Sequence, residues 1–574
     1  MHKRIEHNRT ITPDAYRVLI LVLWMGIAGV FIRIWGLWNY AFNPDEVMLS
    51  FVADATNFTD LWEGIKNQTN APLMYVILHL LIMLGKNELL LRCISLVPGA
   101  GLIIVFYFLG KKVSGAVSGI TMAFLCAFGY GAVQLSQVVR PYSMLLVFLS
   151  GALYFFVSCL EKPGKKYLYG YSLCMLLAIA MHYPAVMFFA AIGCVWLLRS
   201  IIEEKPSAEY RSVIMAHLPS LALFCILYFF HISYHLGGGG VYGTIKETYL
   251  APLFPHTFPG FINNTRDFFG YLFLPPYATL FAVLSMLGVI ALWKTSQRAL
   301  AATIVLTFAI TIVFTIFKLF PFGGSRHSIY LFPMVCLLVG ASAQYGFERF
   351  LPQLTSERAR TGIGWVLVLM VMLSVGAVTF KMRQCDFLRR YKGPGEFSVT
   401  RADYDRIVGY LVNKREPRSV ILTNLQTYHY LAFFNSDEDR NKKTYVALGF
   451  FKFAWEGLDS YLVFVWKFDS TRIINAALQA LKEHAALTKL STIYFVNIGW
   501  ETGFIDTVRS ANPLYKIVFN ERLLLEGGYL YSLSPQAVLR EIGAGRFRNT
   551  AAATPLPDNA YTAERPVDKM PHCM

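Results

Sequence analysis

The segment APLMYVILHLLIMLG, residues 71–85, decides how the rest of the chain is threaded through a membrane. It is apolar, but its 15 residues fall short of the roughly 20 that a helix needs to cross a hydrocarbon core about 30 Å thick. If it does not cross, the turns on the side of the N-terminus are all basic, namely 111–112, 161–166, 199–211, 294–298 and 348–360. Because basic loops stay on the cytoplasmic side, we predict that 71–85 is a juxtamembrane helix and not a span.

Eleven other apolar runs predict a mainly α-helical, polytopic membrane protein with about 11 transmembrane helices. The N-terminal tail is basic and the segment after the first run is acidic, so we expect the N-terminus inside and the C-terminus outside. The predicted spans are 16–38, 89–110, 113–135, 141–160, 167–182, 183–199, 213–234, 271–293, 299–320, 327–347 and 361–380.

The stretch 167–199 is uncharged and is interrupted by His182, Tyr183 and Pro184. Basic residues flank it on both sides, so both of its ends are expected in the cytoplasm. We therefore divide it into two short spans that meet at an outer turn. A single tilted helix is the alternative.

The composition agrees with many lipid-facing segments. Of the 574 residues, 55% are hydrophobic and only 15% are charged, whereas soluble proteins carry about 25% charged residues. The net charge of +16 comes from cations in short loops. No basic tract is interleaved with aromatic residues, so nucleic-acid binding is not expected. The nine cysteines show neither CxxC nor metal-ligand spacing.

From residue 381 the patterning changes to that of a soluble domain. We predict a transmembrane module over 1–380, an extracytoplasmic α/β domain over 381–543, and a disordered tail over 544–574, which is rich in Ala, Pro, Thr and Arg. The expected strands and helices of the α/β domain are 419–423, 445–448, 461–466 and 492–497, and 403–413 and 471–484, respectively.

Ionisable groups near membrane depth cost about 2.5–3.5 kcal/mol each, so they need a reason. In this topology they gather on the outer side, around two long loops, 39–88 and 235–270, and loops of such length are usually functional. The inner turns hold no comparable mixture of carboxylates, arginines and histidines. The outer-side residues are Asp45, Glu46, Asn70, Arg92, Arg140, Tyr142, His182, Tyr183, His256, Arg266, Arg326 and His327.

Asp45 and Glu46 are the sharpest feature of this group. A carboxylate at a partly buried boundary suits a general base acting on an acceptor hydroxyl, or a ligand of a divalent cation. The alternative is a solvated acidic loop that helps to set the topology.

Arg140 and Arg326 carry planar guanidinium groups that suit a phosphate or diphosphate. The alternative is that these arginines merely extend to the membrane interface. For His182 the alternative is a histidine that forms a hydrogen bond at a helix end and has no catalytic part. Together these residues indicate a site that grips a lipid-linked phosphate entering sideways from the bilayer, while an acceptor approaches from water. A lipid transporter, a non-enzymatic scaffold, and a glycan polymerase or ligase that uses a lipid diphosphate are the alternatives.

The order of these motifs resembles that of the membrane glycosyltransferases of the GT-C fold, specifically glycosyltransferase family 39 and the bacterial relatives of dolichyl-phosphate-mannose protein mannosyltransferases. The resemblance covers roughly residues 16–350, and it rests on the order of the motifs on one face. The matching motifs are Asp45-Glu46, Ala71-Pro72-Leu73-Met74-Tyr75, Arg92, Arg140-Pro141-Tyr142, His182-Tyr183 and Arg326-His327.

The resemblance implies a polyprenyl- or dolichyl-phosphate-linked monosaccharide donor and transfer with inversion to a glycan, lipid or protein. Related aminoarabinose transferases carry an acidic residue and a Lys where this chain has Asn70 and Ala71. A metal site of their kind is therefore not implied, and a divalent cation would fall to Asp45 and Glu46. The expected location is a bacterial inner membrane. The implied roles are catalysis for Asp45 with Glu46, donor-phosphate binding for Arg140, Arg326, His182 and Arg92, and substrate contacts for Tyr142, Tyr183, His327 and Asn70.

Overall fold

The structure is a computed structural model of the 574-residue chain. It describes most of the chain up to residue 350 and, beyond residue 400, mainly one helix and seven strands. The described residues are 13–35, 37–162, 164–204, 207–236, 253–255, 257–350, 401–413, 419–424, 433, 445–447, 450–455, 458–464, 492–498, 519–525, 528–533, 536 and 540.

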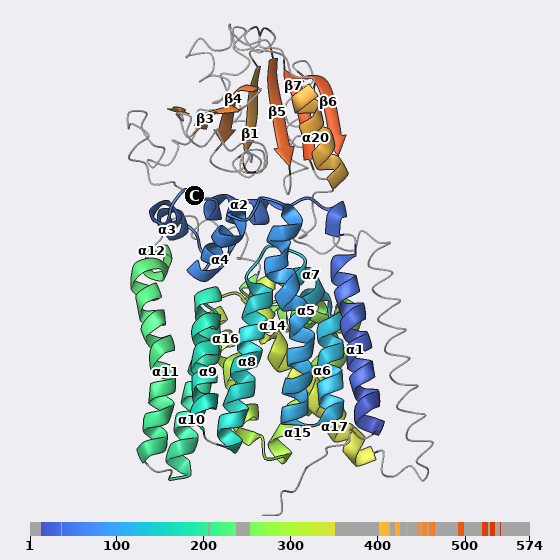
Figure 1. The fold of residues 1–574 in the computed structure, drawn as a ribbon, viewed down its shortest axis with the longest axis vertical. Coiled ribbons are helices and arrows are strands. Elements are labelled where there is room, and N and C mark those ends of the chain that lie inside the picture. The colour runs from blue at the N-terminus through green and yellow to red at the C-terminus, as the bar shows by residue number, and fades with distance from the viewer. Residues whose placement is uncertain are drawn as a thin grey trace, which may run out of the picture.

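A bundle of long apolar helices makes up the larger part of the molecule (Figure 1). Within the described ranges, eight helices are long and apolar enough to cross a membrane, or nine if one bent pair forms a single span. They are α1 (Pro13–Ile34), α5 (Glu88–Val113), α8 (Tyr142–Glu161), α10 (Ala185–Ile202), α11 (Ser207–Leu227) with its continuations η2 (Tyr228–Ile232) and α12 (Ser233–Leu236), α15 (Ala278–Lys294), α16 (Arg298–Ile316), and α17 (Phe332–Phe350) with η6 (Arg326–Leu331) before it.

Two predicted spans differ in detail from the observed helices. The run 113–135 is broken at Gly129, where α6 (Ala116–Phe128) and α7 (Tyr130–Ser136) meet at 54°. The run 271–293 begins later than expected, because Leu274 has a φ of 82° and ends α14 (Phe258–Phe273). The next apolar helix follows η5 (Pro275–Tyr277), and α14 occupies the last part, 258–270, of the loop expected over 235–270.

The predicted division of 167–199 is confirmed. α9 (Lys165–Met181) ends one residue before His182, and α10 begins at Ala185. α9 has 17 residues and packs mainly against α8 and α11, whereas its contact with α10 is small. The predicted span 361–380, the predicted helix 471–484 and His256 lie outside the described residues.

A layer of short helices covers one end of the bundle (Figure 1). It contains α2 (Pro44–Ala53), α3 (Phe58–Lys66) and α4 (Pro72–Ile82), and η1 (Leu37–Asn39) leads into it. At 11 residues, α4 is about 16 Å long and cannot cross a hydrocarbon core. The decisive segment 71–85 is therefore a short helix at the end of the bundle, as predicted.

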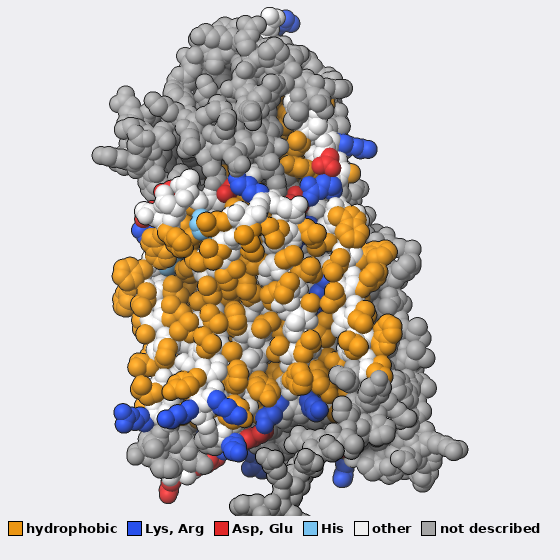
Figure 2. Space-filling model, in the orientation of Figure 1, with side chains coloured by type: hydrophobic (Ala, Val, Ile, Leu, Met, Phe, Trp, Pro, Cys, Tyr) orange, Lys and Arg blue, Asp and Glu red, His pale blue; other side chains and the backbone are white. Residues whose placement is uncertain are grey.

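The two ends of the bundle differ in charge, and we call them the carboxylate end, which carries α2–α4, and the basic end. Between them Figure 2 shows a broad apolar band, to which exposed Leu, Ile, Phe and Trp side chains of many helices contribute. Cations line the basic end, in the last turns of four helices, at Lys111, Lys112, Arg199, Lys294 and Arg349. An apolar band with a charged rim identifies an integral membrane protein.

A mixed sheet of seven strands stands beyond the carboxylate end, with α20 (Arg401–Asn413) against it (Figure 1). The strand order is β2-β3-β4-β1-β5-β7-β6. β1 pairs in parallel with β4 and β5, and the other pairs are antiparallel. The strands are β1 (Ser419–Asn424), β2 (Tyr445–Ala447), β3 (Phe450–Trp455), β4 (Leu458–Phe464), β5 (Thr492–Ile498), β6 (Phe519–Leu525) and β7 (Gly528–Leu533).

Gly99 tests the close approach of α5 to α7. A Cβ placed on Gly99 would overlap the Cβ of Ser136, the last residue of α7. We expect Gly99→Ala to lower the free energy of unfolding by about 1–3 kcal/mol, the usual cost of overpacking. Gly101→Ala, on the same helix with no atom within 4 Å of the added Cβ, should be neutral or stabilising. Thermal unfolding of both variants in lipid nanodiscs is the measurement, and equal effects would contradict the packing argument.

Candidate active site

Asn43 begins α2 with a reciprocal pair of hydrogen bonds. Its side chain accepts from the backbone N–H of Glu46 (2.9 Å), and the Glu46 carboxylate accepts from the backbone N–H of Asn43 (2.8 Å). Pro44 occupies the first helical position, where the missing N–H costs nothing. This capping box fixes the first turn of α2, and therefore the direction of Asp45.

The Glu46 carboxylate also reaches two other segments. It accepts a hydrogen bond from the backbone N–H of Val139 (2.8 Å) and pairs with Nε of Arg92 (3.4 Å). Glu46 is fully buried. Its oxygens are occupied by groups of the protein, and through them Glu46 joins α2 to α5 and to the turn before α8. A part of Glu46 in catalysis or metal binding stays a prediction.

Arg92 is likewise committed within the protein. Its guanidinium donates to the backbone carbonyls of Leu37 (2.9 Å), Tyr40 (3.1 Å) and Ala41 (3.1 Å). Only 2% of Arg92 is exposed. This arginine holds the link between α1 and α2 onto α5, and its binding of the donor phosphate stays a prediction.

The turn that carries Arg140 is held by α5 and α1. Ser95 of α5 donates through Oγ to the carbonyl of Arg140 (2.8 Å) and accepts from its backbone N–H (3.2 Å). Gln137 donates to the carbonyl of Arg33 (2.9 Å). Arg33 is fully buried and donates in return to the carbonyls of Cys126 (2.7 Å) and Ala127 (2.9 Å), just before the break at Gly129. These contacts compensate the broken helix and fix the turn.

Arg326 begins η6, after a loop that packs against α14. Asn264 of α14 donates to the carbonyls of Leu253 (3.0 Å) and Phe322 (2.9 Å). Gly324 lies so near α14 that a Cβ at this position would be 2.6 Å from the carbonyl oxygen of Asp267. The loop therefore follows α14 closely, and α14 sets where Arg326 begins.

Asp45, Arg140 and Arg326 meet at the carboxylate end. The Asp45 carboxylate lies 2.5 Å from the guanidinium of Arg326 and pairs directly with that of Arg140. At most 12% of each of these side chains is exposed. Burial alone would raise the pKa of Asp45, but the charges of Arg140 and then Arg326 outweigh it, so the pKa lies below its usual value. Asp45 is a carboxylate at neutral pH.

Two histidines complete this cluster. His182 follows α9. Its ring stands perpendicular to the ring of Tyr142 in a T-shaped contact, with the ring centroids 5.4 Å apart. Burial, and then the charges of Arg140 and Arg326, lower the pKa of His182 to about 3, so it is a neutral hydrogen-bonding group at physiological pH. Among the described residues its Nε2 is buried and has no hydrogen-bond partner. His327 lies close enough to the same two arginines, to Asp45 and to His182 to interact with them electrostatically.

The remaining predicted residues lie at the edge of this cluster. Asn70 donates to the hydroxyl of Tyr75 (3.3 Å), and Tyr75 is buried within range of the Arg140 and Asp45 charges. Tyr183 follows His182, but its hydroxyl pairs with His231 (2.8 Å) and not with a cluster residue. Asn70 and Tyr183 therefore lie beside the cluster, and their contact with a substrate stays a prediction.

The carboxylate oxygens of Asp45 and Glu46 are engaged by groups of the protein, which leaves few of them to bind a metal ion. Asp45 faces two guanidinium groups, and Glu46 is bonded to two backbone N–H groups and Arg92. Within the part of the chain that the structure describes, no three His, Cys, Asp or Glu side chains converge as metal ligands. The residues at this place fit an anion and not a cation.

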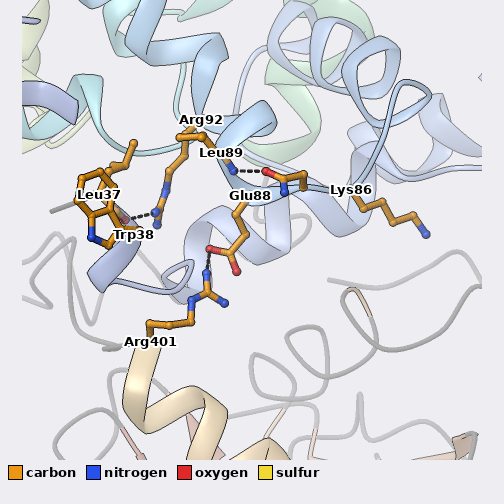
Figure 3. Close-up of a pocket in the computed structure, with 8 residues that line it drawn as sticks. Leu37, Trp38, Lys86, Glu88, Leu89, Arg92 and Arg401 are labelled. Atoms are coloured by element: carbon orange, nitrogen blue, oxygen red, sulfur yellow. Dashed lines mark hydrogen bonds and ion pairs between the residues drawn. The ribbon is translucent and has the colours of Figure 1, made fainter. Parts of the chain in front are cut away.

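A pocket of about 380 Å³ lies between α5 and α20. Figure 3 shows Glu88 of α5 and Arg401 of α20 pointing toward each other across it, and the two form an ion pair. The other cations of the pocket also have carboxylate partners, Asp54 for Lys86 and Glu46 for Arg92. We therefore interpret the pocket as the seam that joins α20 to the bundle. Its lining residues are Leu37, Trp38, Lys86, Asn87, Glu88, Leu89, Arg92 and Arg401.

Residues 69–234 match the sequence family described as dolichyl-phosphate-mannose-protein mannosyltransferase. This segment contains Arg140 and His182 of the cluster. No curated protein matches the sequence.

The solved structures that match the chain include the following three. The Saccharomyces cerevisiae protein O-mannosyltransferase Pmt1–Pmt2 complex bound to the sugar donor is 19% identical with a TM-score of 0.32, over 42% of this chain and 36% of that one. ArnT from Cupriavidus metallidurans in the apo state is 12% identical with a TM-score of 0.48, over 91% and 99%. The Archaeoglobus fulgidus oligosaccharyltransferase tethered with an acceptor peptide is 11% identical with a TM-score of 0.48, over 91% and 74%. The aligned part thus spans little more than a third of the yeast chain.

The matched family segment contains four of the six motifs on which the resemblance rests, whereas Asp45-Glu46 and Arg326-His327 lie outside it. The segment contributes the short helix at 72–82, the Arg140 turn and the His182 turn. In residues 69–234 the chain is thus similar to the dolichyl-phosphate-mannose-protein mannosyltransferase family, the family that the order of its motifs resembles.

Proposed function

We propose that this protein transfers a monosaccharide from a polyprenyl-phosphate carrier to a glycan, lipid or protein acceptor at the outer face of the membrane, with inversion. The observation that carries the proposal is the buried cluster in which one carboxylate, Asp45, faces Arg140 and Arg326. The cluster lies at the end of an apolar bundle, where a lipid-linked phosphate arrives with its chain still in the bilayer. The match of 69–234 to a mannosyltransferase family supports the same class of reaction.

The two arginines supply the phosphate site. Each guanidinium is a planar fork of N–H donors that matches the oxygens of a phosphate. Because the cluster is buried, these charge-assisted bonds are stronger than they would be in water. His182 is neutral, lies within range of the charges of both arginines and has a buried nitrogen, so it adds one hydrogen bond to the phosphate or the sugar.

Donor binding would change the basicity of Asp45. In the structure, Arg140 and Arg326 hold its pKa below the usual value and make it a weak base. A phosphate that takes over their N–H groups removes this stabilisation, and burial then raises the pKa of the carboxylate. Asp45 therefore becomes an effective base when the donor is in place.

The reaction then balances without a further reactant. Asp45 takes the proton of the acceptor hydroxyl, and the acceptor oxygen bonds to the anomeric carbon. The bond from that carbon to the phosphate oxygen breaks, and its electron pair leaves with the polyprenyl phosphate. Arg140 and Arg326 stabilise the charge that gathers on the leaving phosphate. Attack from the face opposite the phosphate inverts the anomeric centre.

The cations at the basic end orient the protein in this proposal. Short basic turns stay in the cytoplasm, so the carboxylate end and the sheet beyond it face outward, in a bacterial inner membrane. Of the predicted domain, α20 and the seven strands stand beyond the carboxylate end, and α20 is attached to α5 through Glu88 and Arg401. We assign acceptor selection to this domain, because an acceptor from the water side meets it first.

The donor class is tested with protein in lipid nanodiscs and a panel of polyprenyl-phosphate sugars. We expect release of polyprenyl phosphate from at least one donor, and a loss of about 100-fold or more in Asp45→Asn, the lower range for losing a general base. Asp54→Asn is the matched control, since it removes a carboxylate of the same kind that pairs with Lys86 (3.0 Å). Turnover of lipid diphosphates alone, or full turnover by Asp45→Asn, would refute the proposal.

Asp45→Asn, which is expected to lower turnover, should strengthen the binding of phosphate. Asp45→Asn should bind a short-chain polyprenyl phosphate about tenfold more tightly than the wild type, because the ligand no longer displaces a carboxylate from Arg140 and Arg326. Arg326→Gln should bind it about tenfold more weakly. Isothermal titration calorimetry measures both, and weaker binding by Asp45→Asn would show that the carboxylate and the phosphate do not compete.

The pH profile should show where Asp45 titrates. Its pKa is depressed in the free protein, and kcat/KM reports the free protein. The phosphate cancels the effect of the arginines in the complex, which kcat reports. Both parameters fall as Asp45 becomes protonated at low pH, and the acid limb of kcat should lie at higher pH than that of kcat/KM. Superimposed limbs would contradict a base released by the donor.

A further inference from the structure

His231 lies near the carboxylate end of the bundle and bridges two segments that are far apart in sequence. One of its ring nitrogens, Nδ1, is 2.8 Å from the hydroxyl of Tyr183, in the turn that carries His182. The other, Nε2, is 2.9 Å from the backbone carbonyl of Ile65, in the last turn of α3. His231 is fully buried.

The carbonyl decides the direction of both hydrogen bonds. A carbonyl oxygen only accepts, so Nε2 carries the hydrogen and donates to Ile65. In the neutral imidazole the lone pair is then on Nδ1, which accepts from the hydroxyl of Tyr183. Burial and the nearby Tyr75 raise the pKa of Tyr183, so its hydroxyl keeps the proton that it donates.

The backbone around His231 departs from a regular helix. Residues Tyr228–Ile232 form one turn of π-helix between α11 and α12. Such turns are rare and occur often at functional sites. The extra residue in this turn changes which side chains face the bundle, and it places the imidazole between α3 and the Tyr183 turn. Figure 1 shows α12 directly beneath α3.

We infer that His231 is a positioning residue, which fixes the His182–Tyr183 turn against α3 and so holds His182 toward Arg140 and Arg326. The inference rests on the proposed function of that cluster. It also assigns a role to α3: this short helix at the membrane surface is coupled to the phosphate site through one imidazole. Neither Tyr183 nor His231 touches the reacting atoms in this assignment.

The same helix offers a matched control. His217 of α11 repeats the arrangement, with Nε2 2.9 Å from the hydroxyl of Tyr171 and Nδ1 2.9 Å from the carbonyl of Val213. Both partners belong to the transmembrane bundle, four residues away on the same helix in the case of Val213. His217→Phe therefore removes a partly buried histidine with the same two kinds of hydrogen bond, without touching α3 or the His182 turn.

The first measurement needs no substrate. Amide hydrogen exchange of the full-length protein in nanodiscs should show faster exchange over 58–66 and 182–184 in His231→Phe, and no change there in His217→Phe. His231→Gln should restore slow exchange, because the Gln amide also donates from one atom and accepts at another. Wild-type exchange in His231→Phe would overturn the inference, whether or not any donor is turned over.

The second measurement uses polyprenyl-phosphate mannose as the donor probe. His231→Phe and Tyr183→Phe should each lower kcat about tenfold, the effect of losing one buried hydrogen bond, and the double variant should be no worse than either. His231→Gln should recover most of the loss, and His217→Phe should match the wild type. Additive losses, or no rescue by Gln, would overturn the positioning role. Absence of turnover in the wild type refutes the proposed function and leaves the exchange result to decide this inference.

Discussion

The buried carboxylate of Glu46 is the interaction on which the geometry of the cluster depends. It caps α2, accepts the N–H of Val139 and pairs with Arg92. Asp45 and Arg140 are the direct chain neighbours of Glu46 and Val139, so one carboxylate sets the distance between the proposed base and the first phosphate-binding arginine. A buried carboxylate of this kind is tolerated because its oxygens accept from two backbone N–H groups and face the Arg92 guanidinium. Glu46 is thus held in place by the protein, whereas Asp45 is the carboxylate whose pKa would change when a donor binds.

Much of the fold follows from length and charge. The 15-residue segment 71–85 is too short to cross, and its assignment as a surface helix orients all later turns. The break at His182 is visible because an uncharged stretch has basic flanks. The break at Gly129 and the late start of α15 are not visible in hydropathy. The break at Gly129 is stabilised by Arg33, which lies on a helix distant in sequence, and the late start of α15 depends on the positive φ of Leu274.

The sequence predicts which residues come together in the candidate site better than it predicts what each of them does there. Asp45, Arg140, His182 and Arg326 come together where the topology puts them, but residue type alone does not say which arginine faces a ligand. Arg92 and Glu46 bond to the backbone, and the spacing of Asn43 and Glu46 is a capping-box signature that would have pointed to this structural role for Glu46. Ser95 and His231 left no signal, because each acts through carbonyls that only the folded chain brings near.

The cluster of two arginines and one aspartate has a consequence for the end of the reaction cycle. Its formal charge is +1, counted from Arg140, Arg326 and Asp45. A sugar phosphodiester carries one negative charge and neutralises the cluster. The discharged carrier is a phosphomonoester with close to two charges at neutral pH, and the proton taken by Asp45 adds another positive charge beside it. The spent carrier is therefore held more firmly than the loaded one. For the proposed reaction, escape of the product from the arginines, and not sugar transfer, would set the pace of turnover.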